Sequence, residues 1–256
     1  MSGAHAHTDL FEPGDSVMHR LDPRAKLLAA LALILAAVTV PQGAYAAYAA
    51  LLAVSATWLV LGRLPPRVVV KRLLAAAPFI LFVAIFVPFA KRDPYGPAVF
   101  LLGLRVPAAG LHALASLLLG ALTAIMALVA LSATTPMHAL TRGMRKLGVP
   151  ALLTTLIAVT WRYLFLLRDE IRAMRVARDS RGYAGRWFWQ AGVIGRMLGS
   201  LYLRTLERSE RMQSAMNSRG FTGVFPGGAL RPLGAADFTF FGLSLAVVVM
   251  IRLLLQ

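Results

Sequence analysis

The 256-residue sequence contains no cysteine, and acidic residues are scarce. Without cysteine, a disulfide framework, a thiolate metal site and a cysteine nucleophile are all excluded. Neither a G-x-x-x-x-G-K-[ST] nucleotide loop nor an H-E-x-x-H zinc motif occurs in the chain. We therefore expect no catalytic residues, no metal site and no cofactor, and no ATP hydrolysis by this chain itself.

The abundant residues are apolar and basic. Apolar residues make up 58% of the chain, whereas soluble domains usually contain about 45–50%. The 27 Lys and Arg residues outnumber the 11 Asp and Glu residues, which gives a formal net charge of +16. A basic excess suits either nucleic acid or the negative cytoplasmic face of a membrane. Long apolar runs favour the membrane, so we expect contacts with lipids and no nucleic-acid partner.

Five apolar runs approach the length of about 20 residues that a membrane-spanning helix needs. Residues 27–40 and 44–61 flank the breaker Pro41-Gln42-Gly43 and predict a helical hairpin, either two full spans or a re-entrant pair. The other predicted spans are 73–90, which follows a basic loop (62–72), then 108–133 and 238–255. The connection after residue 90 is rich in turn-forming residues. The predicted fold class is an all-α integral membrane protein with a bundle of about five transmembrane helices.

Basic residues orient these helices, because cytoplasmic loops carry an excess of Lys and Arg. Arg20, Arg24 and Lys26 place the N-terminus in the cytoplasm, and residues 141–231 carry 16 Lys and Arg against five Asp and Glu. We divide the chain into a cytoplasmic N-terminal segment (1–26), four transmembrane helices (27–133), a cytoplasmic domain of two long helices (134–236) and a C-terminal transmembrane helix (237–256).

The apolar stretch 151–167 within this cytoplasmic domain contains Arg162. An arginine at the centre of a span costs about 2.5–3.5 kcal/mol. We therefore expect this stretch at the cytoplasmic interface or packed under the bundle.

A short phrase centred on arginine occurs twice, 38 residues apart: "RDSRGYAG" at 178–185 and "MNSRGFTG" at 216–223. With the residues just upstream, six positions are identical and a seventh is aromatic in both copies. The identical pairs are Met174 and Met212, Ala177 and Ala215, Ser180 and Ser218, Arg181 and Arg219, Gly182 and Gly220, and Gly185 and Gly223. Chance is a poor explanation for this agreement.

Each copy predicts the C-terminus of a long helix, over about 151–181 and 187–219. Met, Ala and Arg at positions i, i+3 and i+7 share one helix face. Gly182 and Gly220 stand where a glycine in the left-handed conformation commonly ends a helix. Capping explains the Arg-Gly pair but not the recurrence of the other residues. We therefore expect each arginine, with its planar fork of donors, to dock into a carboxylate-bearing groove of a partner.

Asp22-Pro23 and three histidines have structural interpretations. Asp22 followed by Pro23 is a strong helix start, because Asp caps the first turn and proline suits the first helical position. His5 and His7 fit a disordered tail better than a metal site. His112, within the fourth predicted span, is expected to pack between helices rather than to touch a substrate.

Together these features resemble the T component of energy-coupling factor (ECF) transporters, the membrane scaffold of a class of bacterial importers. The helix start "MHRLDPRAKLL" and the paired "SRG" helix ends carry the resemblance. The chain length and the run "RYLFLLRDEIRAMRVARDSRGY" are closest to the cobalt/nickel branch, the CbiQ-like proteins. Both copies have serine where the family motif commonly has alanine, a change of one small residue for another.

The resemblance implies a bacterial inner-membrane protein in which two coupling helices dock onto two ATP-binding-cassette ATPase subunits. Those subunits would bind the ATP, and a separate membrane subunit would bind the substrate. By motif, the implied docking residues are Ser180, Arg181, Gly182, Ser218, Arg219 and Gly220. The supporting face of the coupling helices comprises Met174, Ala177, Met212 and Ala215.

Three alternatives stay open on the sequence. T components for vitamins share the same motifs, so the motifs do not distinguish among cobalt, nickel and a vitamin as the transported substrate. A membrane enzyme that acts on lipid or isoprenoid phosphates would use arginines to hold phosphate, but it would need paired carboxylates, which are scarce here. A channel or carrier would line its pathway with intramembrane polar groups, and few are visible.

Overall fold

The computed structural model describes residues 11–90, 98–101, 104–182, 190–221, 223 and 232–254. Contacts divide these residues into two compact units, with boundaries after Met144 and after Ala229. We call the unit formed by residues 11–144 and 232–254 the helix bundle. The other unit contains two long helices, which we call the helix pair.

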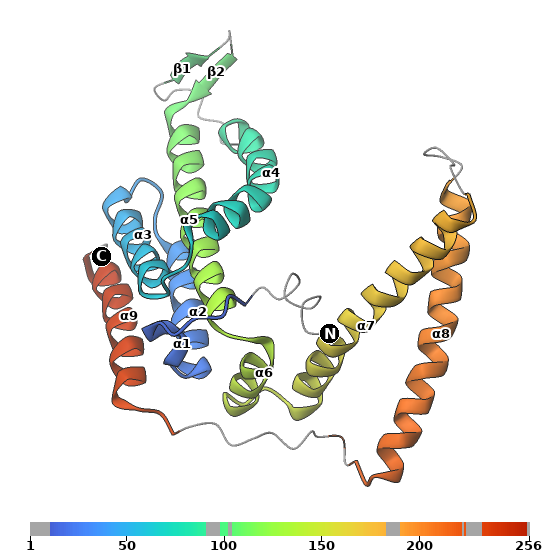
Figure 1. The fold of residues 1–256 in the computed structure, drawn as a ribbon. Coiled ribbons are helices and arrows are strands. Elements are labelled where there is room, and N and C mark those ends of the chain that lie inside the picture. The colour runs from blue at the N-terminus through green and yellow to red at the C-terminus, as the bar shows by residue number, and fades with distance from the viewer. Residues whose placement is uncertain are drawn as a thin grey trace. The chain divides into compact units, whose positions relative to one another are not determined.

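The helix bundle is built around α5 (Ala108–Thr134) (Figure 1). This helix contacts α2 (Pro23–Thr39), α3 (Tyr45–Leu61) and α4 (Pro66–Ala90), and α9 (Ala235–Leu254) packs against α2 and α3. The shorter elements are α1 (Val17–Arg20), α6 (Met137–Lys146) and an antiparallel hairpin of β1 (Ala98–Leu101) and β2 (Leu104–Pro107). The predicted all-α membrane fold is confirmed, and its five apolar helices are α2, α3, α4, α5 and α9.

Small residues allow the bundle helices to approach one another closely. Ala30 and Ala37 of α2 and Ala127 and Ala130 of α5 are buried. At Gly120 of α5, a Cβ atom would lie 3.3 Å from the carbonyl oxygen of Ala37. Within lipid there is little hydrophobic attraction between helices, so association depends on such close van der Waals packing.

The outer surface of the bundle is apolar. On α4, the exposed fractions of Phe79, Phe82 and Phe86 are 74%, 64% and 59%. A contiguous surface of this kind is a liability in water, but it is suited to acyl chains. The bundle is therefore arranged for lipid, with small residues inside and large apolar ones outside.

The helix pair consists of α7 (Ala151–Ser180) and α8 (Gln190–Ser218) (Figure 1). Among the side chains of these helices that the structure describes, only that of Thr154 is buried. By length and composition, α7 is one of four described helices that could cross a membrane, together with α4, α5 and α9, while α3 is apolar but shorter. We predicted an interfacial position for residues 151–167 because of Arg162, and this stays a prediction.

The structure differs from the prediction in three elements. Helix α4 begins at Pro66, so most of the expected loop 62–72 is helical, since prolines are well tolerated in a first turn. The connection expected to consist of turns ends in the β1–β2 hairpin. Helix α6 forms where no helix was predicted, and most of it groups with the bundle, so that the second compact unit begins at Arg145. The predicted cytoplasmic domain over residues 134–236 stays a prediction.

Candidate partner-binding helix ends

Both copies of the repeated phrase lie at helix C-termini, as predicted. Helix α7 ends at Ser180 and α8 at Ser218, and each is followed by its arginine and glycine. Gly182 has φ +68° and Gly220 has φ +72°. A side chain at either glycine would be strained in this left-handed conformation. The glycines therefore set the sharp turn by which the chain leaves each arginine.

The hydrogen bonds after α8 form a complete Schellman motif. The N–H of Gly220 donates to the carbonyl oxygen of Asn217 (3.0 Å), and the N–H of Phe221 donates to that of Met216 (3.0 Å). These two bonds satisfy carbonyls that a helix end otherwise leaves unpaired. At α7, the N–H of Gly182 donates to the carbonyl oxygen of Asp179 (3.1 Å). Gly185, predicted as part of the first copy, lies outside the described residues.

The two serines make local bonds rather than presenting free hydroxyls. Ser180 Oγ donates to the carbonyl oxygen of Ala177 (3.1 Å), and Ser218 Oγ donates to that of Ser214 (3.0 Å). Serine commonly bonds back to its own helix in this way. Within the described residues, these two hydroxyls therefore contribute to the helix ends themselves.

Arg181 and Arg219 are both exposed. Among the described residues, neither guanidinium group forms an ion pair. Each exposed guanidinium group can therefore offer its planar fork of donors to a carboxylate in bidentate fashion.

Arg181 and Arg219 each line a separate open groove of the helix pair. The groove at the end of α8 has a volume of about 460 Å³ and is lined by Met212, Ala215 and Arg219 together with Arg162 and Tyr163 of α7. The predicted face, with Met, Ala and Arg at i, i+3 and i+7, is thus present in α8.

The groove at the end of α7 repeats this arrangement with the helices exchanged. It has a volume of about 430 Å³, and Met174, Ala177 and Arg181 line it together with Val193 and Arg196 of α8. Because α7 and α8 run antiparallel, the C-terminal part of each helix lies beside the N-terminal part of the other. The duplicated sequence therefore produces two similar grooves at opposite ends of the pair.

Few contacts join the two helices. Arg204 of α8 donates to Glu170 of α7 (2.6 Å), and Tyr163 donates to the sulfur of Met212. Meanwhile Leu152, Leu198 and Tyr202 remain more than half exposed. An apolar surface of this extent marks an interaction site in a protein or membrane context.

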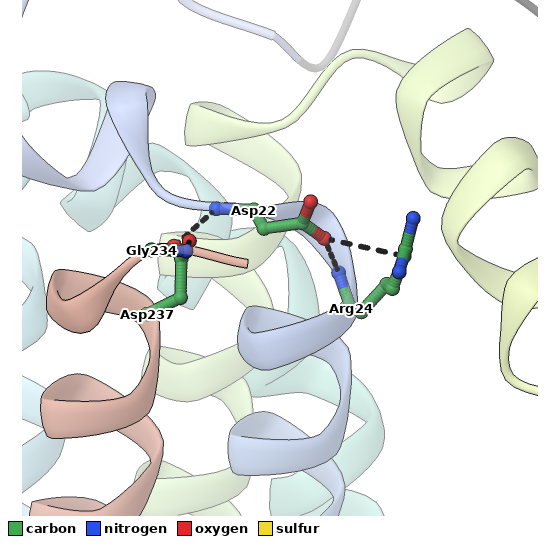
Figure 2. Close-up of polar contacts among 4 residues, drawn as sticks. All are labelled: Asp22, Arg24, Gly234 and Asp237. Atoms are coloured by element: carbon green, nitrogen blue, oxygen red, sulfur yellow. Dashed lines mark hydrogen bonds and ion pairs between the residues drawn. The ribbon is translucent and has the colours of Figure 1, made fainter. Parts of the chain in front are cut away.

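A second polar cluster lies in the helix bundle. Its Asp22 was predicted, but its Asp237 was not. Asp22 caps α2 as expected, because its carboxylate accepts the N–H of Arg24 (2.9 Å) and lies 3.7 Å from Arg24 Nε. Figure 2 shows that Asp237 reaches the same place from α9: its carboxylate accepts the N–H groups of Asp22 (2.7 Å) and Gly234 (2.9 Å). An acid at the third position of an apolar helix was the available signal for Asp237.

His112 pairs with Tyr45, whose hydroxyl forms a hydrogen bond with His112 Nδ1. This is the helix-packing role that the sequence favoured. No group of three or more metal-ligating side chains occurs within the part of the chain that the structure describes.

Taken together, the apolar bundle and the arginine-rich helix pair define a multi-pass membrane protein. Comparison with known proteins makes this assignment specific. The family model of the cobalt transport protein CbiQ matches residues 14–227. The chain therefore belongs to the CbiQ family of cobalt transport proteins, a family of transporter membrane components.

Individual relatives agree with the family assignment. The chain is 30% identical to the energy-coupling factor transporter transmembrane protein EcfT of Leuconostoc gelidum, over 82% of both chains. It is 27% identical to EcfT of Listeria innocua, over 82% of this chain and 83% of that protein. It is 32% identical to the cobalt transport protein CbiQ of Rhodobacter capsulatus, but it spans only about half of that protein, 46% of this chain matching 47% of the relative.

Proposed function

We propose that this chain is the transmembrane scaffold subunit of an ECF-type importer, and that its substrate is cobalt. The single observation that carries the proposal is the pair of matched helix ends, each of which presents an exposed arginine in its own groove. Two equivalent ends suit two equivalent partners. Membership of the cobalt transport family supports the choice of metal, and nickel or a vitamin is the alternative substrate. A lipid-phosphate enzyme is not favoured by this membership.

The partners are two ABC-type ATPase subunits and a separate membrane subunit that binds the substrate. The ATPase subunits bind and hydrolyse ATP, so this chain needs no cofactor. It lies in the bacterial inner membrane with its N-terminus in the cytoplasm, because the basic residues near that end favour the cytoplasmic side. The same rule places the helix pair in the cytoplasm, where the ATPases are.

The mechanism is transmission of movement. ATP binding closes the ATPase dimer, and its two subunits carry Arg181 and Arg219 with them. Each arginine is held in a carboxylate-bearing groove of an ATPase subunit by charge-assisted hydrogen bonds, which are about twice as strong as neutral ones. The displaced helix ends then change how the substrate-binding subunit packs on the membrane helices.

The test is charge reversal of both arginines, Arg181→Glu with Arg219→Glu, in the full complex. Truncating one partner of a buried charge pair costs about 2–5 kcal/mol, and reversal adds repulsion, so we expect the ATPase subunits to be lost on co-purification and cobalt uptake to stop. The matched control is Arg172→Glu with Arg208→Glu, which changes the charge equally at exposed positions outside both grooves. Normal assembly and uptake by the first variant would refute the docking role.

The substrate is tested separately by uptake of labelled cobalt, nickel and vitamins into cells that express the complex. We expect cobalt uptake that depends on this chain. Uptake of a vitamin with no uptake of cobalt would overturn the metal assignment and leave the scaffold role in place.

A further inference from the structure

Two chain segments join the helix pair to the helix bundle. Helix α6 leads through residues 147–150 into α7, and the chain after Arg219 leads into α9, which begins at Ala235. Along the chain, movement of the helix pair can reach the bundle through these two connections. How firmly α6 and α9 are held within the bundle therefore bears on whether movement that follows the chain is transmitted or lost.

Helix α9 is held at its start by Asp237, whose residue is only 6% exposed. One carboxylate oxygen accepts the N–H of Gly234 (2.9 Å), at the beginning of its own helix, and the other accepts the N–H of Asp22 (2.7 Å). Figure 2 shows both bonds. A carboxylate at two helix N-termini is also favoured by both helix dipoles. Asp237 thus ties the first turn of α9 to the first turn of α2.

Helix α6 is held against the same turn of α2 through Gly143. A Cβ atom at this glycine would lie 3.2 Å from Cβ of Pro23 and 3.5 Å from the backbone nitrogen of Arg24. Gly143 is buried, and the absence of a side chain lets the backbone of α6 approach α2 this closely. The connection into α7 therefore starts from a helix that rests on Pro23 and Arg24.

The first turn of α2 is itself fixed to the rest of the bundle by Lys26. Its Nζ donates to the carbonyl oxygens of Met18 (2.9 Å) and Thr134 (3.2 Å), the last residue of α5, and only 2% of the residue is exposed. Lys26 lies just before the predicted span 27–40. Burial lowers the pKa of Lys26 to about 8, and the nearby carboxylates of Asp22 and Asp237 oppose this shift. We call residues 22–27 the α2 junction, because α5, α6 and α9 all meet there.

We propose that Asp237 and Gly143 are positioning residues that fix both connections of the helix pair to the α2 junction. This inference rests on the proposed scaffold function. Displacement of either docked helix end then acts on one rigid point of the bundle, and α2, α5 and α9 move with it. Without either anchor, the connection gives way locally, and ATP is hydrolysed without a matching movement in the membrane.

The first experiment uses Asp237→Asn in the full complex. Asparagine has the same shape but one acceptor oxygen instead of two, so one of the two N–H groups loses its partner. We expect faster hydrogen exchange in the peptide containing Asp22 or Gly234, because loss of a hydrogen bond to a charged group weakens the contact. We also expect unchanged co-purification of the ATPase subunits and a loss of cobalt imported per ATP hydrolysed. The control is Thr239→Ala, an exposed polar position on the same helix whose hydroxyl bonds only within α9.

Each outcome of this experiment decides the proposal. Unchanged hydrogen exchange at Asp22 and Gly234 would show that the anchor does not exist. Faster exchange with unchanged import per ATP would show that the anchor does not serve coupling. Loss of the ATPase subunits from the variant would show a general folding defect and would also contradict the proposal. If the unmodified chain fails to assemble with ATPases, the proposed function is wrong, and the coupling role of the anchor is wrong with it. The hydrogen-exchange measurement still decides whether the anchor between Asp237 and Asp22 exists.

The second anchor provides an independent variant. In Gly143→Val the side chain has to displace α6 from Pro23, so we expect the same pattern of retained ATPase assembly and reduced import per ATP. Gly143→Ala, which adds a single methyl group, should lie between this variant and the unmodified chain. Lys146→Ala, at an exposed position of α6, is the control. Import per ATP that stays normal in Gly143→Val would overturn the role of α6 in transmission.

Discussion

In the helix bundle the side chains of Leu33 and Leu51 are wholly buried, whereas the helix pair buries only Thr154 among its described side chains. The bundle is thus held by its own contacts. In the helix pair, an exposed ion pair and a contact between Tyr163 and Met212 join the two helices, and an open groove lies at the C-terminal end of each helix. Two regions of similar helical content therefore differ in what specifies them. The bundle is stabilised by its own packing, whereas the helix pair leaves most of its described side chains at least partly exposed.

The largest expected difference between the two regions follows from truncating one leucine in each. Leu51→Ala leaves a cavity in the bundle core, where such a change costs about 2–5 kcal/mol. Leu203→Ala, at a position of α8 that is 60% exposed, should change stability by less than about 0.5 kcal/mol. Thermal unfolding of the isolated chain in detergent measures both. Equal losses of stability would mean that the helix pair has a packed core of its own.

A smaller effect is expected at the helix end. Gly220→Ala puts a side chain on a residue with φ +72° and should destabilise the end of α8 by about 1 kcal/mol. The matched control is Gly199→Ala, in the interior of α8 with no atom near the added Cβ. That change should stabilise α8 by about 0.5–1 kcal/mol. Helicity and hydrogen exchange of α8 measure the two effects, and the same sign in both variants would contradict the left-handed conformation at Gly220.

The smallest effect is expected for the ion pair between the two helices. Glu170→Gln removes the partner of Arg204, whose side chain is 62% exposed, and exposed ion pairs contribute about 0.2–1 kcal/mol. Glu207→Gln, an exposed acid on α8, is the control. Thermal unfolding at low and high salt should show that the difference between the variants shrinks as salt screens the pair. A difference above about 2 kcal/mol would mean that this pair carries the contact between α7 and α8.

Much of this architecture was predictable because its signals are local. The five apolar helices follow from composition, and the ends of α7 and α8 follow from a glycine that can adopt positive φ after a helical pattern. The start of α2 follows from the Asp22-Pro23 pair. Helix α6 and the β1–β2 hairpin were missed, because α6 is short and mixed in character and the hairpin follows a turn-rich stretch.

The roles of Asp237 and Gly143 could not be predicted in the same way. Asp237 bonds to Asp22, 215 residues away in sequence, and Gly143 matters because of Pro23. The residues next to Asp237 or Gly143 in sequence do not indicate either pairing. Asp237 is an acid near a helix start and Gly143 is a glycine in a basic segment, and each pattern is compatible with several structural roles.

By itself, the sequence determined the membrane fold, the two duplicated helix ends and the family, because each depends on periodicity, composition or motif within a few turns of chain. The tertiary structure decided that each arginine shares its groove with the other helix, and that α5, α6 and α9 meet at the first turn of α2. Those arrangements depend on which helix faces pack together, and packing between distant segments is decided by shape and by buried hydrogen bonds rather than by local pattern.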